Sequence, residues 1–296
     1  MSPIRSTAVA AAAVAAAVAL PTAASAKTIT LPAGFSAEAM TAHRGALYVS
    51  SQTSGEVRRI DTRSGRQTVL VKGRAGERGN GLRFAPGNRL IVAGGTAGTI
   101  DVFDSRSGRL VRRHEVPGAG FLNGVAVQGK TAYVTDTLTH LIHALPTSGR
   151  GEVRAIRPGG DFTPNRLDLD GIVPARAGTL LTGQYGSGKL FAFSTRTNAT
   201  RQVRLNARLP TNDGLALRGR TLFVAENRGK VQVVRLTADL RRGRVTQTLP
   251  RGRRLRNPVD LALVGGHLWV LDGHAPGSDP ATVARQVDSI VDLGRF

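Results

Sequence analysis

A motif repeated at a near-constant spacing constrains the fold of this chain more than any other feature. Each copy has a small polar residue, an apolar run, a turn and a second apolar run that ends in a polar residue, as in NDGLALRGRTLFVAEN at 212–227. Six polar residues that start the copies, here called the ring residues, lie 42, 43, 47, 43 and 47 residues apart: Glu38, Asn80, Asn123, Asp170, Asp213 and Asp260. Repeats of this length are typical of solenoids and propellers.

The pattern inside each repeat predicts four short β-strands. After Gly214, the segment LALRGRTLFVAENRGKVQVVRL has three apolar runs with turns at Gly219 and Gly229, and a fourth run, VTQTLPRG, follows. Four strands in such a repeat make one propeller blade. The sixth unit lacks its fourth strand, and KTITLPAG near the N-terminus resembles the missing segment. We therefore expect one all-β domain over residues 27–296, a six-bladed propeller of four-stranded antiparallel blades, closed by the N-terminal strand joining the last blade.

The first 26 residues have the three regions of a secretory signal peptide. Arg5 precedes a run of small and apolar residues, Pro21 ends the run, and Ala24-Ser25-Ala26 gives the spacing for cleavage. The alternative is a transmembrane anchor, but the apolar core is shorter than the ~20 residues that a span needs. We expect cleavage after Ala26, a secreted protein and no membrane span in the mature chain.

The charge of the chain is strongly basic, +21 overall, and the sequence has no cysteine. Disulfides therefore cannot hold this fold together. A basic surface attracts polyanions such as wall phosphate polymers, although an arginine-rich composition can also reflect codon bias. The densest basic segment, residues 241–256, contains no aromatic residue, so base stacking is poorly served and we do not expect a nucleic-acid partner. We expect a monomer.

Two rows of polar residues are predicted to converge on one mouth of the central channel. In a propeller the first strand of each blade lines the channel, so the ring residues should encircle that mouth. The second strand runs back to the same face, and its last residues include Asp136, Gln184, Glu226 and Asp272, here called the outer row. Together with Asn80 and Asp260, these four residues are candidates for substrate contact at the mouth.

The ring residues allow two interpretations. Carboxylate and amide oxygens suit a hard cation such as Ca²⁺ or Mg²⁺, and the ring lacks the His and Cys ligands typical of zinc or redox metals. In contrast, Asp-Gly and Asn-Gly pairs are common in turns, where the side chain bonds nearby backbone, so the ring could be scaffold. The sequence leaves both interpretations open.

The copies NGLRFAPGNRLIVAG, LNGVAVQGKTAYVTD and NDGLALRGRTLFVAEN resemble the senescence marker protein/gluconolactonase family of lactonase-like, strictosidine-synthase-like six-bladed propellers. The resemblance implies one divalent cation at the channel mouth, held by a first-blade Glu and by an Asn and an Asp of later blades. It also implies that this Asp acts as general acid and base in lactone hydrolysis. By position, Glu38 matches the Glu, Asp170 stands in the place of the Asn, and Asp213 matches the catalytic Asp.

Two functions follow as expectations. The first is a secreted hydrolase of a small lactone or related ester, with one Ca²⁺-like cation bound by Glu38, Asp170 and Asp213, and with Asn123 as a fourth ligand. Three carboxylates at one mouth repel one another unless a cation neutralises them. The second is a non-catalytic secreted propeller that docks on anionic wall polymers or on a protein partner.

Overall fold

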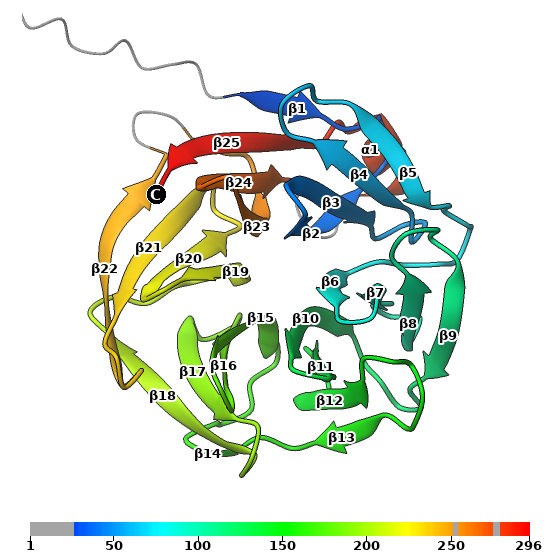
Figure 1. Cartoon of the computed structure of the whole chain (residues 1–296). Coiled ribbons are helices and arrows are strands. Elements are labelled where there is room, and N and C mark those ends of the chain that lie inside the picture. The colour runs from blue at the N-terminus through cyan, green and yellow to red at the C-terminus, as the bar shows by residue number, and fades with distance from the viewer. Residues whose placement is uncertain (1–26, 251–253, 275–278) are drawn as a thin grey trace, which may run out of the picture.

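The computed structural model describes residues 27–250, 254–274 and 279–296. The expected signal peptide, residues 1–26, lies outside the described residues. The described part of the chain forms a β-propeller whose sheets surround a central axis (Figure 1). Its elements are almost all short antiparallel strands, in agreement with the apolar runs of four to eight residues and with the turns between them.

Three blades follow the chain in the order that the repeat predicts. Each is a four-stranded antiparallel sheet with its first strand nearest the axis. The first contains β2 (Ala37–His43), β3 (Ala46–Ser51), β4 (Val57–Asp61) and β5 (Gln67–Val71). The second contains β6 (Gly81–Ala85), β7 (Arg89–Ala93), β8 (Thr99–Asp104) and β9 (Leu110–Glu115). The third contains β10 (Leu122–Gln128), β11 (Thr131–Asp136), β12 (Leu141–Pro146) and β13 (Arg154–Ile156).

The next two repeats do not form separate sheets, which corrects the expectation of six independent blades. One nine-stranded sheet joins β15 (Leu169–Arg176), β16 (Thr179–Gln184), β17 (Lys189–Ser194) and β18 (Ala199–Leu205) to β22 (Arg242–Leu249), β21 (Lys230–Leu236), β20 (Thr221–Glu226) and β19 (Asn212–Arg218). The join is a short parallel pairing of β18 with β22, and β14 (Gly159–Gly160) also pairs with β18. Because the outer edges of the two units bond each other there, hydrogen bonding defines five sheets among the described residues.

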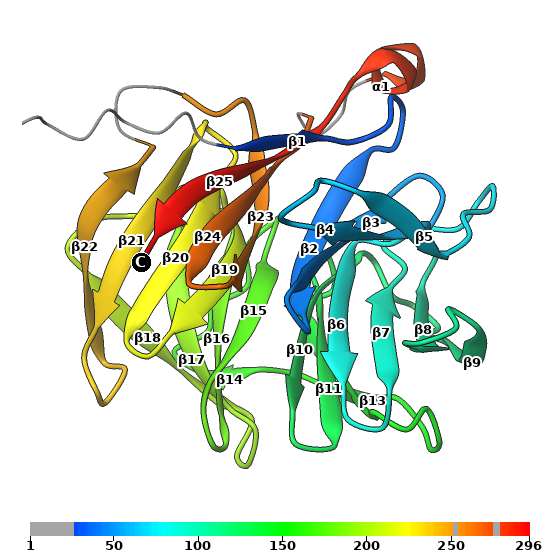
Figure 2. The same cartoon turned by 45° about the horizontal axis from the view of Figure 1, so that its top comes forward.

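The last sheet closes the ring with the N-terminal strand, as the sequence predicts. Its order is β1 (Thr28–Thr30), β25 (Ser289–Arg295), β24 (His267–Asp272) and β23 (Pro258–Val264). Ile29 pairs with Ile290 and is buried. Figure 2 shows β1 lying along β25, the strand at the other end of the chain. The ends of the chain thus cover each other's sheet edge.

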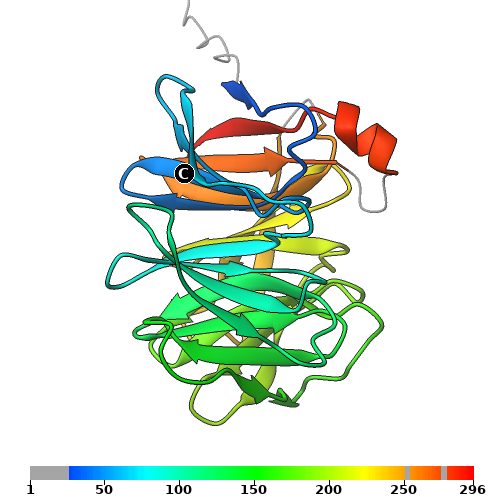
Figure 3. The same cartoon turned by 90° about the vertical axis from the view of Figure 1, so that its right-hand side faces the viewer.

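The axis is lined by the innermost strands, which contact one another in a closed cycle from β2 through β6, β10, β15, β19 and β23 back to β2. A short helix, α1 (Pro280–Arg285), follows β24 and projects from one face (Figure 3). Asp279 caps it by accepting hydrogen bonds from the backbone N–H groups of Ala281 and Thr282.

The core lies between adjacent blades and is supplied by one repeated position of the second strand. The six residues there are at most 7% exposed: Tyr48, Ile91, Tyr133, Leu181, Phe223 and Trp269. Burial of one such side chain contributes roughly 1.5–3 kcal/mol. These residues pack the blades together, so function must be sought nearer the axis.

Candidate functional site at the channel mouth

The structure brings all six ring residues to one narrow cavity on the axis, here called the throat. The throat has room for about 20 Å³, which is close to one water molecule. It is walled by the starts of the innermost strands, so residues 42 or more apart in sequence face one another. The ring residues therefore meet at one place, as the sequence predicts.

Irregular pairing of the innermost strands places the ring side chains there. The register between first and second strands shifts by one residue at five of the six ring positions: around Glu38, Asn123, Asp170, Asp213 and Asp260. A β-bulge of this kind re-aims a side chain that regular alternation would send into the sheet face. The bulges turn the ring side chains towards the axis.

The glycines after the ring residues are explained by close approach of neighbouring strands. A Cβ on Gly171 would lie 2.1 Å from the carbonyl oxygen of Asp213, and one on Gly214 would lie 2.3 Å from Oδ1 of Asp260. Both glycines lie within strands, and neither has a positive φ. The turn interpretation of these Asp-Gly pairs therefore does not apply. Glycine is needed because the next blade occupies the space of a side chain.

Four carboxyl groups face one another in the throat, and this shifts their proton equilibria. Burial first, and then repulsion from Asp213 and other acids, raises the pKa of Glu38 and of Asp170 well above the ordinary values. Burial raises the pKa of Asp213 to about 7, against an opposing hydrogen bond from Asn227. Burial also raises the pKa of Asp260 to about 6. Groups that titrate near neutrality are suited to proton transfer.

A cation that the sequence analysis missed also lines the throat. Arg83 donates from Nε to the carbonyl oxygen of Val125 (3.0 Å) and from Nη1 to Oγ1 of Thr41 (3.0 Å). Burial lowers the pKa of Arg83, and attraction to Asp260 opposes this. In the sequence, Arg83 cannot be distinguished from an ordinary polar residue of an innermost strand. Its position near Asp260 becomes evident only in the structure, where β6 and β23 both line the axis. One guanidinium thus partly balances four carboxyl groups.

The oxygen atoms of the throat are of the kind that bind hard cations, but in this structure they are not arranged as a metal-binding site. Its polar donors are oxygen atoms, and Oδ1 of Asn80 is buried without a hydrogen-bond partner. Such donors match Ca²⁺ or Mg²⁺. However, in the part of the chain that the structure describes, no three Asp, Glu, His or Cys side chains form a group arranged to hold a metal ion. Binding would require the carboxylates to turn towards a common point.

Above the throat lies a wider cavity of about 350 Å³, here called the mouth. Glu38, Asn123, Asp170 and Asp213 line both cavities. One part of the mouth wall is apolar, formed by Phe121, Leu138, Leu167 and Val259. The rest is polar and includes residues at strand ends and in loops: Gln52, Thr137, Tyr185, Asn227 and His274. A ligand with a polar head and an apolar body matches this lining.

Side-chain amides fix the acids that line the mouth. Nδ2 of Asn227 donates to Oδ2 of Asp213 (2.8 Å) and to the carbonyl oxygen of Pro258 (3.0 Å). Nε2 of Gln52 donates to Oε2 of Glu38 (3.1 Å). Burial, followed by the charges of Asp213, Asp170 and Glu38, raises the pKa of Tyr185 to about 12. Tyr185 directly follows outer-row Gln184, and this adjacency was the only sequence clue to it.

The outer-row residues lie at the ends of second strands but are absent from the lining of both cavities. Asp136 accepts from the backbone N–H groups of Gly120 and Phe121, and Asp272 accepts from that of Asn257 (2.7 Å). Nε2 of Gln184 donates to the carbonyl oxygen of Thr163, and Glu226 accepts from Gln232. All four are at most 6% exposed. Their bonds tie strand ends to neighbouring loops or, for Glu226, to the next strand.

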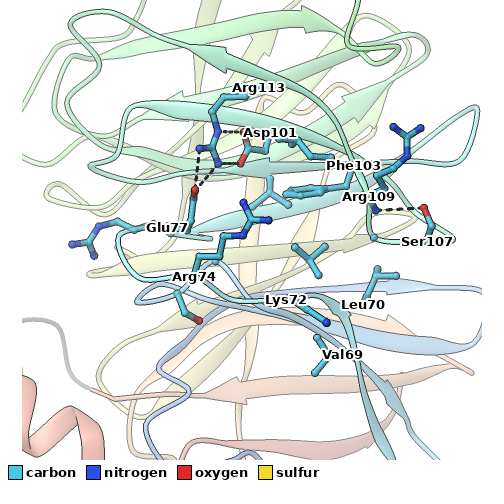
Figure 4. A pocket seen from close by; sticks show the side chains of 17 residues that line it. Val69, Leu70, Lys72, Arg74, Glu77, Asp101, Phe103, Ser107, Arg109 and Arg113 are labelled. Carbon is cyan, nitrogen blue, oxygen red and sulfur yellow. Dashed lines mark hydrogen bonds and ion pairs between the residues drawn. The ribbon is translucent and has the colours of Figure 1, made fainter.

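A third hollow lies on the outside of the propeller, between the first two blades (Figure 4). This groove of about 570 Å³ is formed by β5, the loop after it, β8 and β9. Arg113 forms paired bonds with Glu77 and with Asp101 on one side. Lys72, Arg74 and Arg109 also line it, and their side chains form no ion pair within the described residues.

The propeller, with a polar throat at its axis, defines the class of protein, and a comparison of sequences gives the family. Residues 18–228 match the SMP-30/Gluconolactonase/LRE-like region, which covers more than half of the chain. The chain belongs to this family, as the repeated motifs suggested. A search of curated proteins found no match.

Solved structures share the fold at low sequence identity. The major Malassezia sympodialis allergen Mala s 1 has a TM-score of 0.68 at 14% identity, covering 90% of this chain and 95% of the allergen. A catalytically inactive histidine-to-alanine variant of virginiamycin B lyase from Staphylococcus aureus, solved with quinupristin, has a TM-score of 0.61 at 13% identity, covering 92% and 82%. U3-55K has a TM-score of 0.61 at 10% identity, covering 92% and 99%. At these identities the likeness concerns the fold alone.

The described residues contain no helix with the length and apolar character needed to traverse a bilayer.

Proposed function

We propose that this protein hydrolyses a small lactone or a related ester at the mouth. The observation that carries the proposal is Asp213, which lines both the throat and the mouth and whose pKa is raised to about 7 by burial. A carboxyl group with such a pKa exchanges protons readily at neutral pH. Membership of the SMP-30/Gluconolactonase/LRE-like family supports the same reaction class.

In this proposal the residues of the mouth divide the work. The apolar wall of Phe121, Leu138 and Leu167 holds the body of the substrate and limits water. Asp213, fixed through Oδ2 by Asn227, takes a proton from the attacking water and returns it to the leaving oxygen. A divalent cation, with Ca²⁺ as our first choice, would be held by Glu38, Asp170 and Asp213 with Asn123, and would supply polarisation of the carbonyl.

The test is hydrolysis of a panel of γ- and δ-lactones by the purified protein, with calcium or with chelator. We expect Asp213→Asn to lower kcat/KM by about 10²–10⁴-fold, as loss of a general base does. The control is Asp239→Asn, since Asp239 is exposed and lies in a turn that lines neither cavity. Equal activity of Asp213→Asn and the wild type would refute the proposal.

Architecture and export are part of the same proposal. We treat the nine-stranded sheet as two blades joined at their edges, so that the ring has six blades. Deletion of residues 27–32 should then destabilise the protein strongly, because the last blade would lose β1.

We also propose that the chain is secreted after cleavage behind Ala26. Protein isolated from the medium should begin at Lys27, and a chain that retains Met1 would contradict this.

The outer groove supports a second candidate function, which is docking on an anionic wall polymer. Lys72, Arg74 and Arg109 offer three cations beside the apolar surface of Val69 and Leu110 (Figure 4). Polyphosphate can serve as the probe. Reversing these three charges to Glu should weaken binding far more than reversing three exposed arginines elsewhere, namely Arg157, Arg196 and Arg220. Equal losses would indicate only a general response to net charge.

A further inference from the structure

A histidine that the proposed reaction does not use also lines the mouth. His274 lies just after β24, and it is the one histidine of the described chain among the residues that line this cavity. Its side chain is 7% exposed. Three acidic ring residues, Glu38, Asp170 and Asp213, line the same cavity. His274 is thus placed where a substrate would enter, on a loop rather than on an innermost strand.

A buried carboxylate stands behind the imidazole. Nδ1 of His274 is 3.5 Å from Oδ2 of Asp288, whose side chain is 2% exposed. The same Oδ2 accepts a hydrogen bond from the backbone N–H of Ala37 (2.7 Å), while Oδ1 is buried without a partner. An unpartnered buried carboxylate oxygen is costly, and a small rotation of the imidazole would satisfy it. Nδ1 of His274 also lacks a hydrogen-bond partner among the described residues, and catalytic hydrogen bonds of this kind often form only when substrate binds.

The other ring nitrogen faces hydrogen-bond donors. Nε2 of His274 is 2.9 Å from Nε2 of Gln52 and 3.3 Å from Oγ of Ser36. The amide nitrogen of Gln52 can only donate, and it also donates to Glu38. Nε2 of the imidazole must therefore accept, which places the proton of neutral His274 on Nδ1, towards Asp288. This is the tautomer that a general base requires.

Together with Asp288 and His274, Ser36 completes a carboxylate–imidazole–hydroxyl series, but Ser36 is buried and does not line the mouth. It is 3% exposed and has a φ of 53°, a left-handed value uncommon for a residue other than glycine. Its hydroxyl is therefore positioned to hold the imidazole rather than to meet a substrate in the mouth.

From this geometry we propose that His274, held by Asp288, is a second general base at the mouth that hydrolyses activated esters without a metal ion. Nε2 accepts from a water molecule once Gln52 rotates towards Glu38 and the Ser36 hydroxyl turns away from the ring. The water gives a proton to Nε2 as its oxygen bonds to the carbonyl carbon. The bond from that carbon to the leaving oxygen then breaks, and the imidazolium returns the proton to the leaving oxygen, so that acid and alcohol are released.

The experiment measures hydrolysis of phenyl acetate by the full chain in excess chelator. We expect His274→Gln to lower the rate by about 10²-fold or more. Excess chelator separates this activity from the proposed lactonase, which uses a bound cation. His140→Gln is the matched control, because His140 is a partly exposed histidine that also contacts a buried aspartate, Asp168, but does not line the mouth. Equal rates for His274→Gln and the wild type would overturn the proposal, as would a rate abolished by chelator.

Two further measurements keep the proposal testable if a variant folds poorly. Long-range ¹H–¹⁵N spectra of the wild type should show His274 protonated on Nδ1, and Asp288→Asn should shift it towards the Nε2 tautomer. Protonation of the wild-type ring on Nε2 would contradict the proposal. Labelling by a fluorophosphonate should leave Ser36 unmodified. A covalent adduct on Ser36 would show a serine nucleophile instead and would overturn the general-base assignment.

Discussion

Asp136 and Asp213 both lie near the channel-mouth face, yet their surroundings drive their pKa values in opposite directions. Burial tends to raise the pKa of Asp136, but hydrogen bonds from His143, the Phe121 and Gly120 backbone N–H groups and Thr139 hold it well below its usual range. Asp213 accepts a hydrogen bond from the side chain of Asn227, but burial, and then repulsion from Asp260, raises its pKa to about 7. The number of donors, rather than depth alone, separates the two.

The two rows also differ in what engages their side chains, although burial raises the pKa of outer-row Glu226 too. Outer-row side chains are engaged by backbone groups, amides or cations, and their bonds connect strand ends to loops or to the next strand. Ring acids are held near one another with Arg83 as the guanidinium that lines the throat. A carboxylate that is fully bonded stabilises the fold, whereas one that is held close to others can bind cations or protons. This difference predicts opposite responses to the same Asp→Asn substitution.

Among single substitutions in the two rows, the largest effect is expected for Asp136→Asn. The substitution replaces a buried carboxylate that accepts from the backbone N–H groups of Gly120 and Phe121 and contacts His143 at 3.4 Å, and each buried donor left unsatisfied costs about 1–3 kcal/mol. Urea denaturation should show this loss in the free energy of unfolding. The control is Asp239→Asn, an exposed position where about 0.5 kcal/mol or less is expected. Asp213→Asn should not destabilise the metal-free protein at pH 8, and a loss as large as that of Asp136→Asn would remove the distinction between the rows.

A pH titration of wild-type stability in chelator tests the ring acids directly. The pKa values of Asp213 and Asp260 are raised to about 7 and about 6 in the folded protein. Folded protein therefore holds these protons more tightly than the unfolded chain, whose Asp groups titrate near pH 4. Stability is fully present below about pH 4 for these groups and is lost as pH rises towards 7, by about 1.4 kcal/mol per pH unit for each ionising carboxyl.

Asp213→Asn should flatten this decline, and Glu226→Gln in the outer row is the matched comparison. Burial raises the pKa of Glu226 too, but bonds from Gln232 and Lys230 oppose the shift, so its share of the decline should be smaller. Thermal melting at half-unit steps between pH 4 and pH 8 measures the slopes. Identical slopes for wild type and Asp213→Asn would mean that burial does not raise the pKa of Asp213 in the folded protein.

Much of this arrangement could be predicted from the repeat. The spacing of Glu38, Asn123 and Asp213 gives the innermost strands, and the leftover segment near Thr28 gives the closure, because both depend on contacts that each repeat encodes locally. The pairing of β18 with β22 could not be predicted, since it joins the outer edges of two repeats and leaves no periodic trace.

The site divides in the same way. The ring residues follow from periodicity, whereas Arg83, Tyr185 and the His274–Asp288 pair depend on loops and on contacts across the axis. The outer row shows a different limit of prediction from sequence. Asp136 occupies a position like that of a mouth residue, but the sequence does not reveal that the backbone N–H groups of Gly120 and Phe121 point at it.

Calcium should separate the rows by the smallest of these effects. A cation that binds the assembled throat and not the unfolded chain stabilises the fold by about 2.7 kcal/mol at a hundred times its Kd. We expect calcium to raise the Tm of the wild type and of Glu226→Gln equally, because Glu226 is bonded to Gln232 away from the throat. Asp213→Asn should lose this response, since it removes one carboxylate of the proposed ligand set. The gain should also be larger at pH 8 than at pH 5, where protons compete for the same carboxylates. If calcium leaves the Tm of the wild type unchanged at pH 8, protons and Arg83 alone balance the negative charge of the ring residues, and the protein does not bind this cation.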